Sequence, residues 1–227
     1  MKAKISVILP AYNAGKYIGE ALRSVIDQTI PIHEIIVIDD GSTDSTKDIV
    51  SGFPVHYFYQ ANSGTAAALN AGIEQSSGDY LAFIDADDVW MPQRLYVQLQ
   101  AFEKNPSLDM VFGLMQQFVS PELSEEEKNK IEVNTAEVMI GIHKSAWLIK
   151  REAFMGVGVF AGGFLLEEFT DWYARSKEKK LNEFVVQEVV AKRRIHLSNT
   201  SRVHKDLKKD YPRILKAALD RRRQQEQ

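Results

Sequence analysis

The 227-residue sequence contains no cysteine, so disulfide bonds, thiolate catalysis and cysteine-bound metals are excluded. It also lacks a signal peptide and any apolar run of about eighteen residues, which predicts a soluble, cytoplasmic protein. The net charge of −3 gives no support to nonspecific nucleic-acid binding. A hydrophobic content of 44%, with no linker or internal repeat, predicts one domain over residues 1–227.

Three carboxylates, Asp85, Asp87 and Asp88, stand close together at the end of an apolar run that begins at Tyr80. Carboxylates this close repel one another unless a cation or hydrogen-bond donors offset their charge. Carboxylate oxygens, without cysteine or clustered histidine, select hard divalent cations such as Mg²⁺ or Mn²⁺. Acidic turns at strand ends are also common, so the carboxylates alone do not establish a metal site.

The first part of the chain alternates apolar runs with helical patterns, which is typical of an α/β fold with a parallel sheet. The expected strands are residues 5–10, 34–38, 55–59 and 80–84. Parallel sheets bind ligands outside the carboxyl ends of their strands, where Tyr12, Asp40, Gly64 and Asp87 are expected. Tyr12 offers an aromatic face for a base, and Asp40 offers an acceptor for a base N–H. The alternative for Asp40 is an Asx turn or helix cap.

Four motifs in this part carry a family resemblance. They are Pro10-Ala11-Tyr12-Asn13, Asp39-Asp40-Gly41-Ser42-Thr43-Asp44, Asn62-Ser63-Gly64 with Leu69-Asn70-Ala71-Gly72-Ile73, and Gly78-Asp79-Tyr80 through Asp85-Ala86-Asp87-Asp88. In this order and spacing they resemble the nucleotide-sugar half of family 2 glycosyltransferases. The resemblance implies a GT-A-like α/β fold, with a mostly parallel central sheet flanked by helices. It divides the domain into a donor half (1–102), an acceptor half (103–203) and a basic C-terminal helix (204–227).

The resemblance also implies roles for individual residues. Asp85, Asp87 and His196 are the expected metal ligands, and Leu69 departs from an arginine that many relatives carry at this point. The residues expected to contact the nucleotide-sugar are Pro10, Ala11, Tyr12, Asn13, Asp39, Asp40, Gly64, Asn70, Asp85, Ala86, Arg194 and His196. An imidazole could complete the metal shell or bond the diphosphate, and arginines could neutralise the leaving nucleotide. The alternative for residues 191–201 is a basic surface strand following a strand at 185–190.

The expected catalytic base lies in an acidic helix near residue 170. Relatives usually carry a Glu-Asp pair, but aligning Asp171 with the family pattern places Glu168 on its glutamate and Phe169 on its aspartate. Glu168 is therefore favoured as the base, then Asp171, with Glu167 third. The alternative is an acidic helix N-terminus that complements the helix dipole. His143, in a segment similar to the family's acceptor side, could touch a substrate or be structural.

Together these features predict a metal-dependent enzyme that transfers a sugar from a nucleotide-diphosphate donor, a UDP-sugar being favoured, with Mg²⁺ or Mn²⁺. The acceptor, whether saccharide, lipid, peptide or small molecule, is not identified, and inversion is implied only by the family. A noncatalytic nucleotide-sugar-binding module is the main alternative. A nucleotidyltransferase fits less well, because residues 11–15 do not form a glycine-rich, basic phosphate loop. The apolar face of the basic C-terminal helix packs on the domain or touches anionic lipid.

Overall fold

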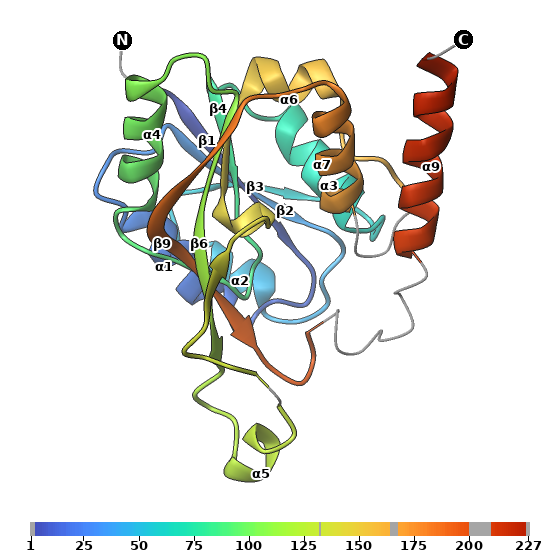
Figure 1. Cartoon of the computed structure of the whole chain (residues 1–227). Helices are drawn as coiled ribbons and strands as arrows, with labels where there is room; N and C mark the ends of the chain where they lie inside the picture. The colour runs from blue at the N-terminus through green and yellow to red at the C-terminus, as the bar shows by residue number, and fades with distance from the viewer. Residues whose placement is uncertain (1–2, 132, 164–167, 200–209, 226–227) are drawn as a thin grey trace.

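The computed structural model describes residues 3–131, 133–163, 168–199 and 210–225, and in it the first four strands pair in parallel as predicted (Figure 1). They are β1 (Ile5–Ala11), β2 (Glu34–Asp39), β3 (His56–Tyr59) and β4 (Tyr80–Phe83), in the order β3-β2-β1-β4. The helices between them are α1 (Ile18–Ile26), α2 (Thr46–Val50) and α3 (Thr65–Glu74). Each crossover returns the chain to the same end of the sheet, so the loops after β1, β2 and β4 share one edge.

The second half of the chain turns the parallel sheet into a curled, mixed one. Its strands are β5 (Val89–Trp90), β6 (Met110–Val119), β7 (Val138–Ile140), β8 (Trp147–Lys150) and β9 (Glu183–Ile195). The strand order is β3-β2-β1-β4-β8-β6-β9-β5, with β7 paired to β6. Strand β8 is antiparallel to both β4 and β6, whereas β9 is parallel to β6. The predicted GT-A-like α/β arrangement is present, but the sheet is mixed and not mostly parallel. Among the described residues, four of its eight strand pairs are parallel, and three of these four lie in the donor half.

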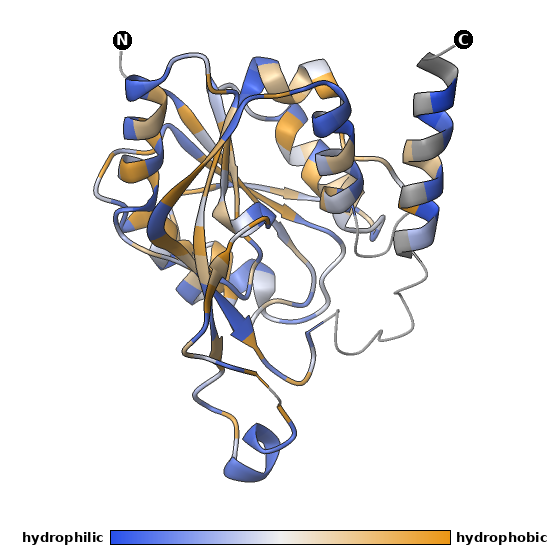
Figure 2. Ribbon diagram, viewed as in Figure 1, coloured by the Kyte–Doolittle hydropathy of each residue, from blue (hydrophilic) through white to orange (hydrophobic). Residues whose placement is uncertain are grey.

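Helices cover both faces of this sheet, because successive strand residues point to opposite faces. Val7 and Leu9 of β1 pack in a core with α1 and α4 (Arg94–Lys104), whereas Ile8 packs in a second core. That second core includes α3, α6 (Arg151–Val157) and α7 (Glu168–Glu178). Figure 2 shows the apolar strands running through the centre of the molecule.

Glycine at position 72 allows α3 to lie close against β1. A Cβ added to Gly72 would stand 2.5 Å from Cγ2 of Ile8, which is well inside a normal contact. The absence of a side chain therefore sets how closely this helix approaches the sheet.

The loop between β4 and β5 crosses from the middle of the sheet to its edge. Strands β8, β6 and β9 lie between β4 and β5 in the strand order, yet only residues 84–88 connect the two strands. Because neighbouring strands are about 4.8 Å apart, a flat sheet would separate β4 from β5 by about 19 Å. The loop contains a turn, in which the Asp88 N–H donates to the Asp85 carbonyl at 3.0 Å, so it is not fully extended. The sheet must therefore be curled, so that the acidic loop can connect the central strand β4 to the edge strand β5.

Two segments project from this body. Residues 120–131 and 133–137 lie in an arm between β6 and β7, with the short helix α5 (Glu125–Lys128) at its tip (Figure 1). Ser124 and Glu127 form a capping box there, which stabilises this single helical turn. At the other end, α9 (Asp210–Gln225) lies beside α7. Nowhere in the described part of the chain is there a helix both long enough and apolar enough to cross a membrane.

The C-terminal helix packs on the domain, which is one of the two possibilities raised by its sequence. Arg221 forms a two-point ion pair with Glu178 of α7, at 2.9 and 3.0 Å, and Ile214 is buried. Residues 204–209 of the predicted helix lie outside the described residues, and lipid contact by the helix remains a prediction.

Candidate active site

The turns after β1 and β2 are joined by hydrogen bonds through Asn13 and Asp39. The Asn13 N–H donates to Ser42 Oγ at 2.9 Å, and Asn13 Oδ1 accepts from the Thr43 N–H at 2.9 Å. Asp39 is buried, and its oxygens accept from the Ser42 N–H at 2.8 Å and the Tyr57 hydroxyl at 2.6 Å. The exposed Asn13 and the buried Asp39 thus both fix the turns at which the nucleoside is expected to bind.

Asp40 anchors the loop that starts α3. Its Oδ1 accepts from Gln60 Nε2 at 2.7 Å and the Ser63 N–H at 2.8 Å, and its Oδ2 accepts from the Gly64 N–H at 2.8 Å. Gly64 has φ +88°, a left-handed conformation that favours glycine, so the loop folds around the carboxylate. This geometry agrees with the alternative role of Asp40, in which its carboxylate bonds backbone N–H groups of a turn before a helix. An incoming base would have to use the remaining acceptor capacity of Asp40.

Tyr12, next to these turns, is 56% exposed, which leaves its ring free to face a ligand. The preceding residues Pro10 and Ala11 end β1 and are largely covered. Asn70, which is expected to contact the donor, makes a contact within the protein. Its amide exchanges two hydrogen bonds with the Phe160 backbone, at 2.9 and 3.0 Å, and so fixes α3 to the segment after α6. Leu69 is fully buried in the core and offers nothing to a nucleotide.

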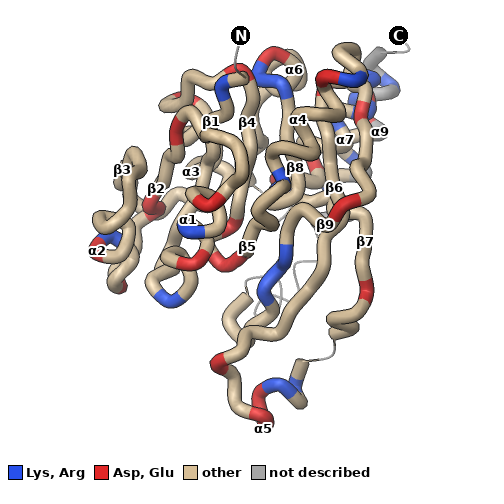
Figure 3. Tube along the Cα trace, turned by 90° about the vertical axis from the view of Figure 1, so that its left-hand side faces the viewer, with Lys and Arg blue, Asp and Glu red and all other residues tan. Residues whose placement is uncertain are grey.

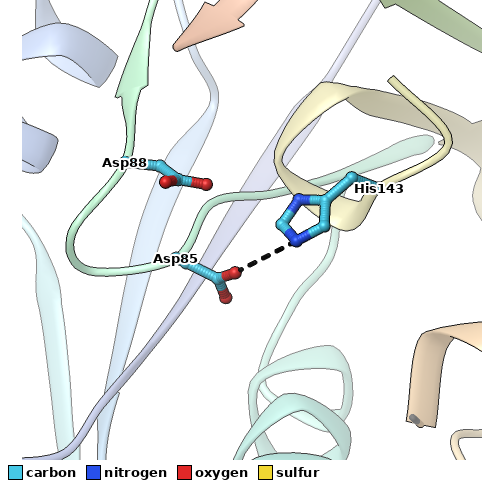
Figure 4. A group of neighbouring side chains, drawn as sticks. All are labelled: Asp85, Asp88 and His143. Atoms are coloured by element: carbon cyan, nitrogen blue, oxygen red, sulfur yellow. Dashed lines mark ion pairs between the residues drawn. The ribbon is translucent and has the colours of Figure 1, made fainter. Parts of the chain in front are cut away.

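The acidic loop presents Asp85 and Asp88 to the segment before β8. Figure 4 shows these two carboxylates facing the His143 ring, and in Figure 3 the acidic positions of the loop lie beside β5. Candidate ligand atoms of the three side chains lie within 4.8 Å of one another. Asp85 Oδ2 is 3.7 Å from His143 Nε2. Ala86 occupies the turn between the two carboxylates and is partly buried.

Asp88 supplies the observation that tests this loop as a cation site. Its carboxyl is buried, and Oδ2 has no hydrogen-bond partner among the described residues. Burial, together with the charges of Asp87 and Asp85, raises the pKa of Asp88 well above its ordinary value. A divalent cation would supply the missing partner and remove this repulsion, so the carboxylates fit a hard metal ion.

His143 fits a hydrogen-bonding role better than a ligand role. Its Nδ1 accepts from the Ser145 N–H at 3.2 Å, so the proton of the neutral ring lies on Nε2, facing Asp85. Burial lowers the pKa of His143, which favours that neutral ring. Metal ligation through Nε2 would require the proton to move to Nδ1, against the Ser145 donor.

Asp87 is held by residues that follow β9. Its Oδ2 lies 3.0 Å from His196 Nε2 and accepts from Asn199 Nδ2 at 3.1 Å. Burial alone would raise the pKa of Asp87, but the hydrogen bond to His196 and the charge of that ring outweigh it and lower the pKa. His196 Nδ1 lies 2.9 Å from Ser198 Oγ, and Tyr17 packs on the ring with centroids 4.7 Å apart. The predicted proximity of His196 and Asp87 is present.

Arg194 requires a correction, because it lies inside β9 and not after it. The strand runs to Ile195, well beyond the predicted end at residue 190, and the Arg194 side chain is 2% exposed. Its guanidinium donates to the Asp87 carbonyl at 2.9 Å and to Ser120 Oγ at 3.2 Å, and it pairs with Glu20. Arg194 therefore stabilises the acidic loop through the Asp87 carbonyl. Its guanidinium N–H groups bond to partners inside the protein and do not point toward a diphosphate.

On the acceptor side, Glu168 meets the acidic loop through a lysine. Glu168 begins α7 and is only 1% exposed, and its Oε1 lies 2.6 Å from Lys144 Nζ. The same Nζ lies 3.2 Å from Asp85 Oδ1. Burial alone would lower the pKa of Lys144, but Asp85 and Glu168 raise it above its ordinary value, so the lysine is charged. Glu168 is thereby the candidate base that reaches the carboxylate cluster.

Asp171 faces the C-terminal helix. Its Oδ2 accepts from Arg175 Nε at 2.9 Å, and its Oδ1 lies 3.8 Å from Arg221 Nη1 of α9. Phe169, which the family resemblance aligns with an aspartate, packs against Trp147 in the aromatic core. Glu167 lies outside the described residues.

Two residues of the site were not identified from the sequence, Lys144 and Tyr17. Both look like ordinary surface residues in the sequence, because a lysine or tyrosine next to a turn is usually solvated. The pairing of β8 with β4 brings Lys144 to the acidic loop, and Tyr17 contacts His196, the residue after β9 that holds Asp87.

The sequence model of Glycosyl transferase family 2 matches residues 6–158 of this chain. An uncharacterized glycosyltransferase of Nostoc sp., alr2836, is 40% identical over 117 residues, which cover 49% of this chain and 36% of that protein. Among solved structures, Staphylococcus aureus TarS 1-349 in complex with UDP matches with a TM-score of 0.67 and 22% identity. A Pyrobaculum calidifontis mannosyltransferase, PcManGT, in complex with GDP-Man and Mn²⁺ matches with a TM-score of 0.62 and 18% identity.

These two structures share the fold with the present chain. The matches cover 86% and 88% of this chain, but 61% and 59% of the respective solved chains. The chain thus spans less than two thirds of each protein that it resembles here.

Proposed function

Because the chain belongs to glycosyl transferase family 2, we propose that it transfers a sugar from a nucleotide-diphosphate donor, with UDP-sugars favoured, to an acceptor hydroxyl. The observation that carries this proposal is the meeting of two groups at one edge of the sheet. The exposed Tyr12 ring lies at the end of β1, and the Asp85–Asp88 loop follows β4, the strand next to β1. The UDP complex of TarS, which has the same fold, supports the choice of nucleotide.

The proposed donor site has a nucleoside end and a phosphate end. Tyr12 stacks on the base, with Pro10, Ala11 and Asp40 shaping the pocket around it. Asp85, Asp87 and Asp88 hold Mg²⁺ or Mn²⁺, with His196 orienting Asp87. When bound, such a cation supplies positive charge that stabilises the leaving diphosphate. The Mn²⁺ in the complex of the mannosyltransferase PcManGT supports a divalent metal.

Glu168 acts as the general base in this proposal. Its carboxylate takes the proton of the acceptor hydroxyl while the acceptor oxygen forms a bond to the anomeric carbon and the bond to the diphosphate breaks. Attack from the face opposite the diphosphate inverts the anomeric configuration. The acceptor is a saccharide, lipid, peptide or small molecule that enters beside Lys144 and α7.

Thermal stabilisation by UDP tests the donor site. UDP with Mn²⁺ should raise the melting temperature of the wild-type protein by mass action, and Asp87→Asn should remove most of the metal-dependent part. Asp27→Asn, at an exposed position after α1, is the matched control and should keep the full shift. If UDP and other nucleoside diphosphates leave the melting temperature unchanged with either metal, this donor site is wrong.

A noncatalytic nucleotide-sugar-binding module is the second candidate, and one observation favours it. Phe169 occupies the position of an expected aspartate, and Glu168 is paired with Lys144. Release of UDP from a panel of UDP-sugars separates the two candidates. A transferase slowly hydrolyses its own donor, and active-site substitutions abolish the hydrolysis. A binding module leaves all of the donors intact.

A further inference from the structure

Lys144 occupies an unusual position for a lysine. It begins a short 3₁₀ helix (Lys144–Ala146) directly before β8, and its side chain is only 11% exposed. Its ammonium group lies between two carboxylates from different parts of the chain, Asp85 Oδ1 at 3.2 Å and Glu168 Oε1 at 2.6 Å. A buried ammonium group loses much of its hydration, so two carboxylate partners must offset that loss.

The segment that carries Lys144 faces both oxygens of Asp85 and forms an ion pair with one of them. Lys144 lies against Oδ1, and His143 Nε2 lies 3.7 Å from Oδ2. Asp88 Oδ2, by contrast, has no hydrogen-bond partner among the described residues. A cation that enters the acidic loop therefore finds Asp88 available and Asp85 already engaged by a positive charge.

We propose that Lys144 is an internal counter-ion that competes with the divalent cation for Asp85 and links this carboxylate to Glu168. This inference rests on the proposed metal-dependent function. In the metal-free protein, Lys144 neutralises Asp85 and Glu168 together. When a divalent cation binds, the ion pair of Lys144 with Asp85 breaks and the ion pair with Glu168 remains. Binding of metal and donor therefore changes the charge that Lys144 presents to Glu168, the proposed base. Lys144 is thus a positioning residue, because it acts on the reaction through Asp85 and Glu168.

The competition predicts opposite effects on stability and on metal binding. Lys144→Met should lower the melting temperature of the metal-free protein, because Asp85 and Glu168 lose their shared counter-charge. The same substitution should tighten Mn²⁺ binding about tenfold, because a positive charge next to the cation site is removed. A lysine that serves only to stabilise the fold would lower the melting temperature without tightening metal binding.

Titration of Mn²⁺ into the protein with saturating UDP, followed by calorimetry, measures this affinity. Lys144→Arg should bind Mn²⁺ like the wild type, because it keeps the competing charge. Lys177→Met is the matched control, since Lys177 forms a 2.7 Å ion pair with Glu183 on the surface of α7. It should leave Mn²⁺ binding unchanged. If Lys144→Met fails to fold, the double variant Lys144→Met with Glu168→Gln, compared with Glu168→Gln alone, makes the same measurement without a buried unpaired glutamate.

The outcomes separate this inference from the proposed function. Equal or weaker Mn²⁺ binding by Lys144→Met, with normal binding by the wild type, overturns the competition and leaves the donor site intact. No Mn²⁺ binding by either protein overturns the competition together with the metal part of the proposed function. Tighter binding by Lys144→Met and not by Lys177→Met supports the competition.

Discussion

Tyr12 allows the proposed donor site to be tested with little expected effect on the fold. Its ring is 56% exposed, so Tyr12→Ala should leave the melting temperature nearly unchanged. Loss of stacking on the base should weaken UDP binding by about tenfold, since one stacked base contributes about 1–3 kcal/mol. Calorimetric titration with UDP measures the effect, with Tyr96→Ala, an exposed tyrosine on α4, as control. Equal weakening in both variants would remove Tyr12 from the nucleoside site.

Glu168 and Asp171 lie on one helix but contact different partners, so their substitutions should differ. Glu168→Gln should lower turnover by about 10²-fold or more, as expected for a lost general base. Asp171→Asn should lower turnover less but cost about 3 kcal/mol of folding free energy, because Arg175 loses a largely buried partner. Donor-turnover assays and urea unfolding provide the two measurements. The reverse order of effects on turnover would assign the base to Asp171.

At the scale of elements, Gln98 joins α4 to the strands beneath the site. Its Nε2 donates to the Val111 carbonyl at 3.0 Å and to the Ala146 carbonyl at 2.9 Å, at the end of the 3₁₀ helix that carries Lys144. Gln98→Leu keeps the volume but leaves these buried carbonyls unsatisfied, at a cost of about 2 kcal/mol. Urea unfolding should show the loss. Gln100→Leu, on the exposed side of the same helix, should be nearly neutral.

Glu34 joins β2 to β1 and to the loop before β4, and it makes their pairing sensitive to acid. Its Oε1 accepts from Ser6 Oγ and from the Ser77 N–H, both at 2.6 Å. Burial alone would raise the pKa of Glu34, but these hydrogen bonds lower it below the ordinary 4.5. A lowered folded-state pKa gives stability that is present above pH 4.5 and is lost as the pH falls through the folded-state pKa. Glu34→Gln should therefore be less stable than wild type at neutral pH, with the difference shrinking below pH 4.5.

Unfolding curves of both proteins between pH 7 and pH 3 provide the check. A difference that stays constant over this range would mean that the Glu34 charge contributes nothing to the β1–β2 connection.

At the scale of the whole molecule, the sequence predicts the donor half better than the acceptor half. Strands β1, β2 and β3 pair in parallel with their neighbours in the chain, so each apolar run and its turn already indicate the sheet edge. The acceptor half depends on pairing between distant residues, such as β6 with β9. Local patterns do not reveal that Arg194 is buried within a long strand, or that Lys144 reaches Glu168. For the same reason, the side chains of Asn70 and Asp171 serve internal contacts that no motif shows.

Because the connection from β4 to β5 is short, ligand binding at this loop should also affect how readily β5 separates from β9. Residues 84–88 set the circumference of the curled sheet, because they tie a central strand to an edge strand that is held by β9. A ligand that grips Asp85, Asp87 and Asp88 would also oppose separation of β5 from β9, since opening that edge moves the same loop. Amide hydrogen exchange at Met91, whose N–H donates to the Val190 carbonyl at 3.0 Å, should slow when UDP and Mn²⁺ are added. If the acidic loop binds the donor as proposed, the same five residues both hold the ligand and limit the separation of β5 from β9.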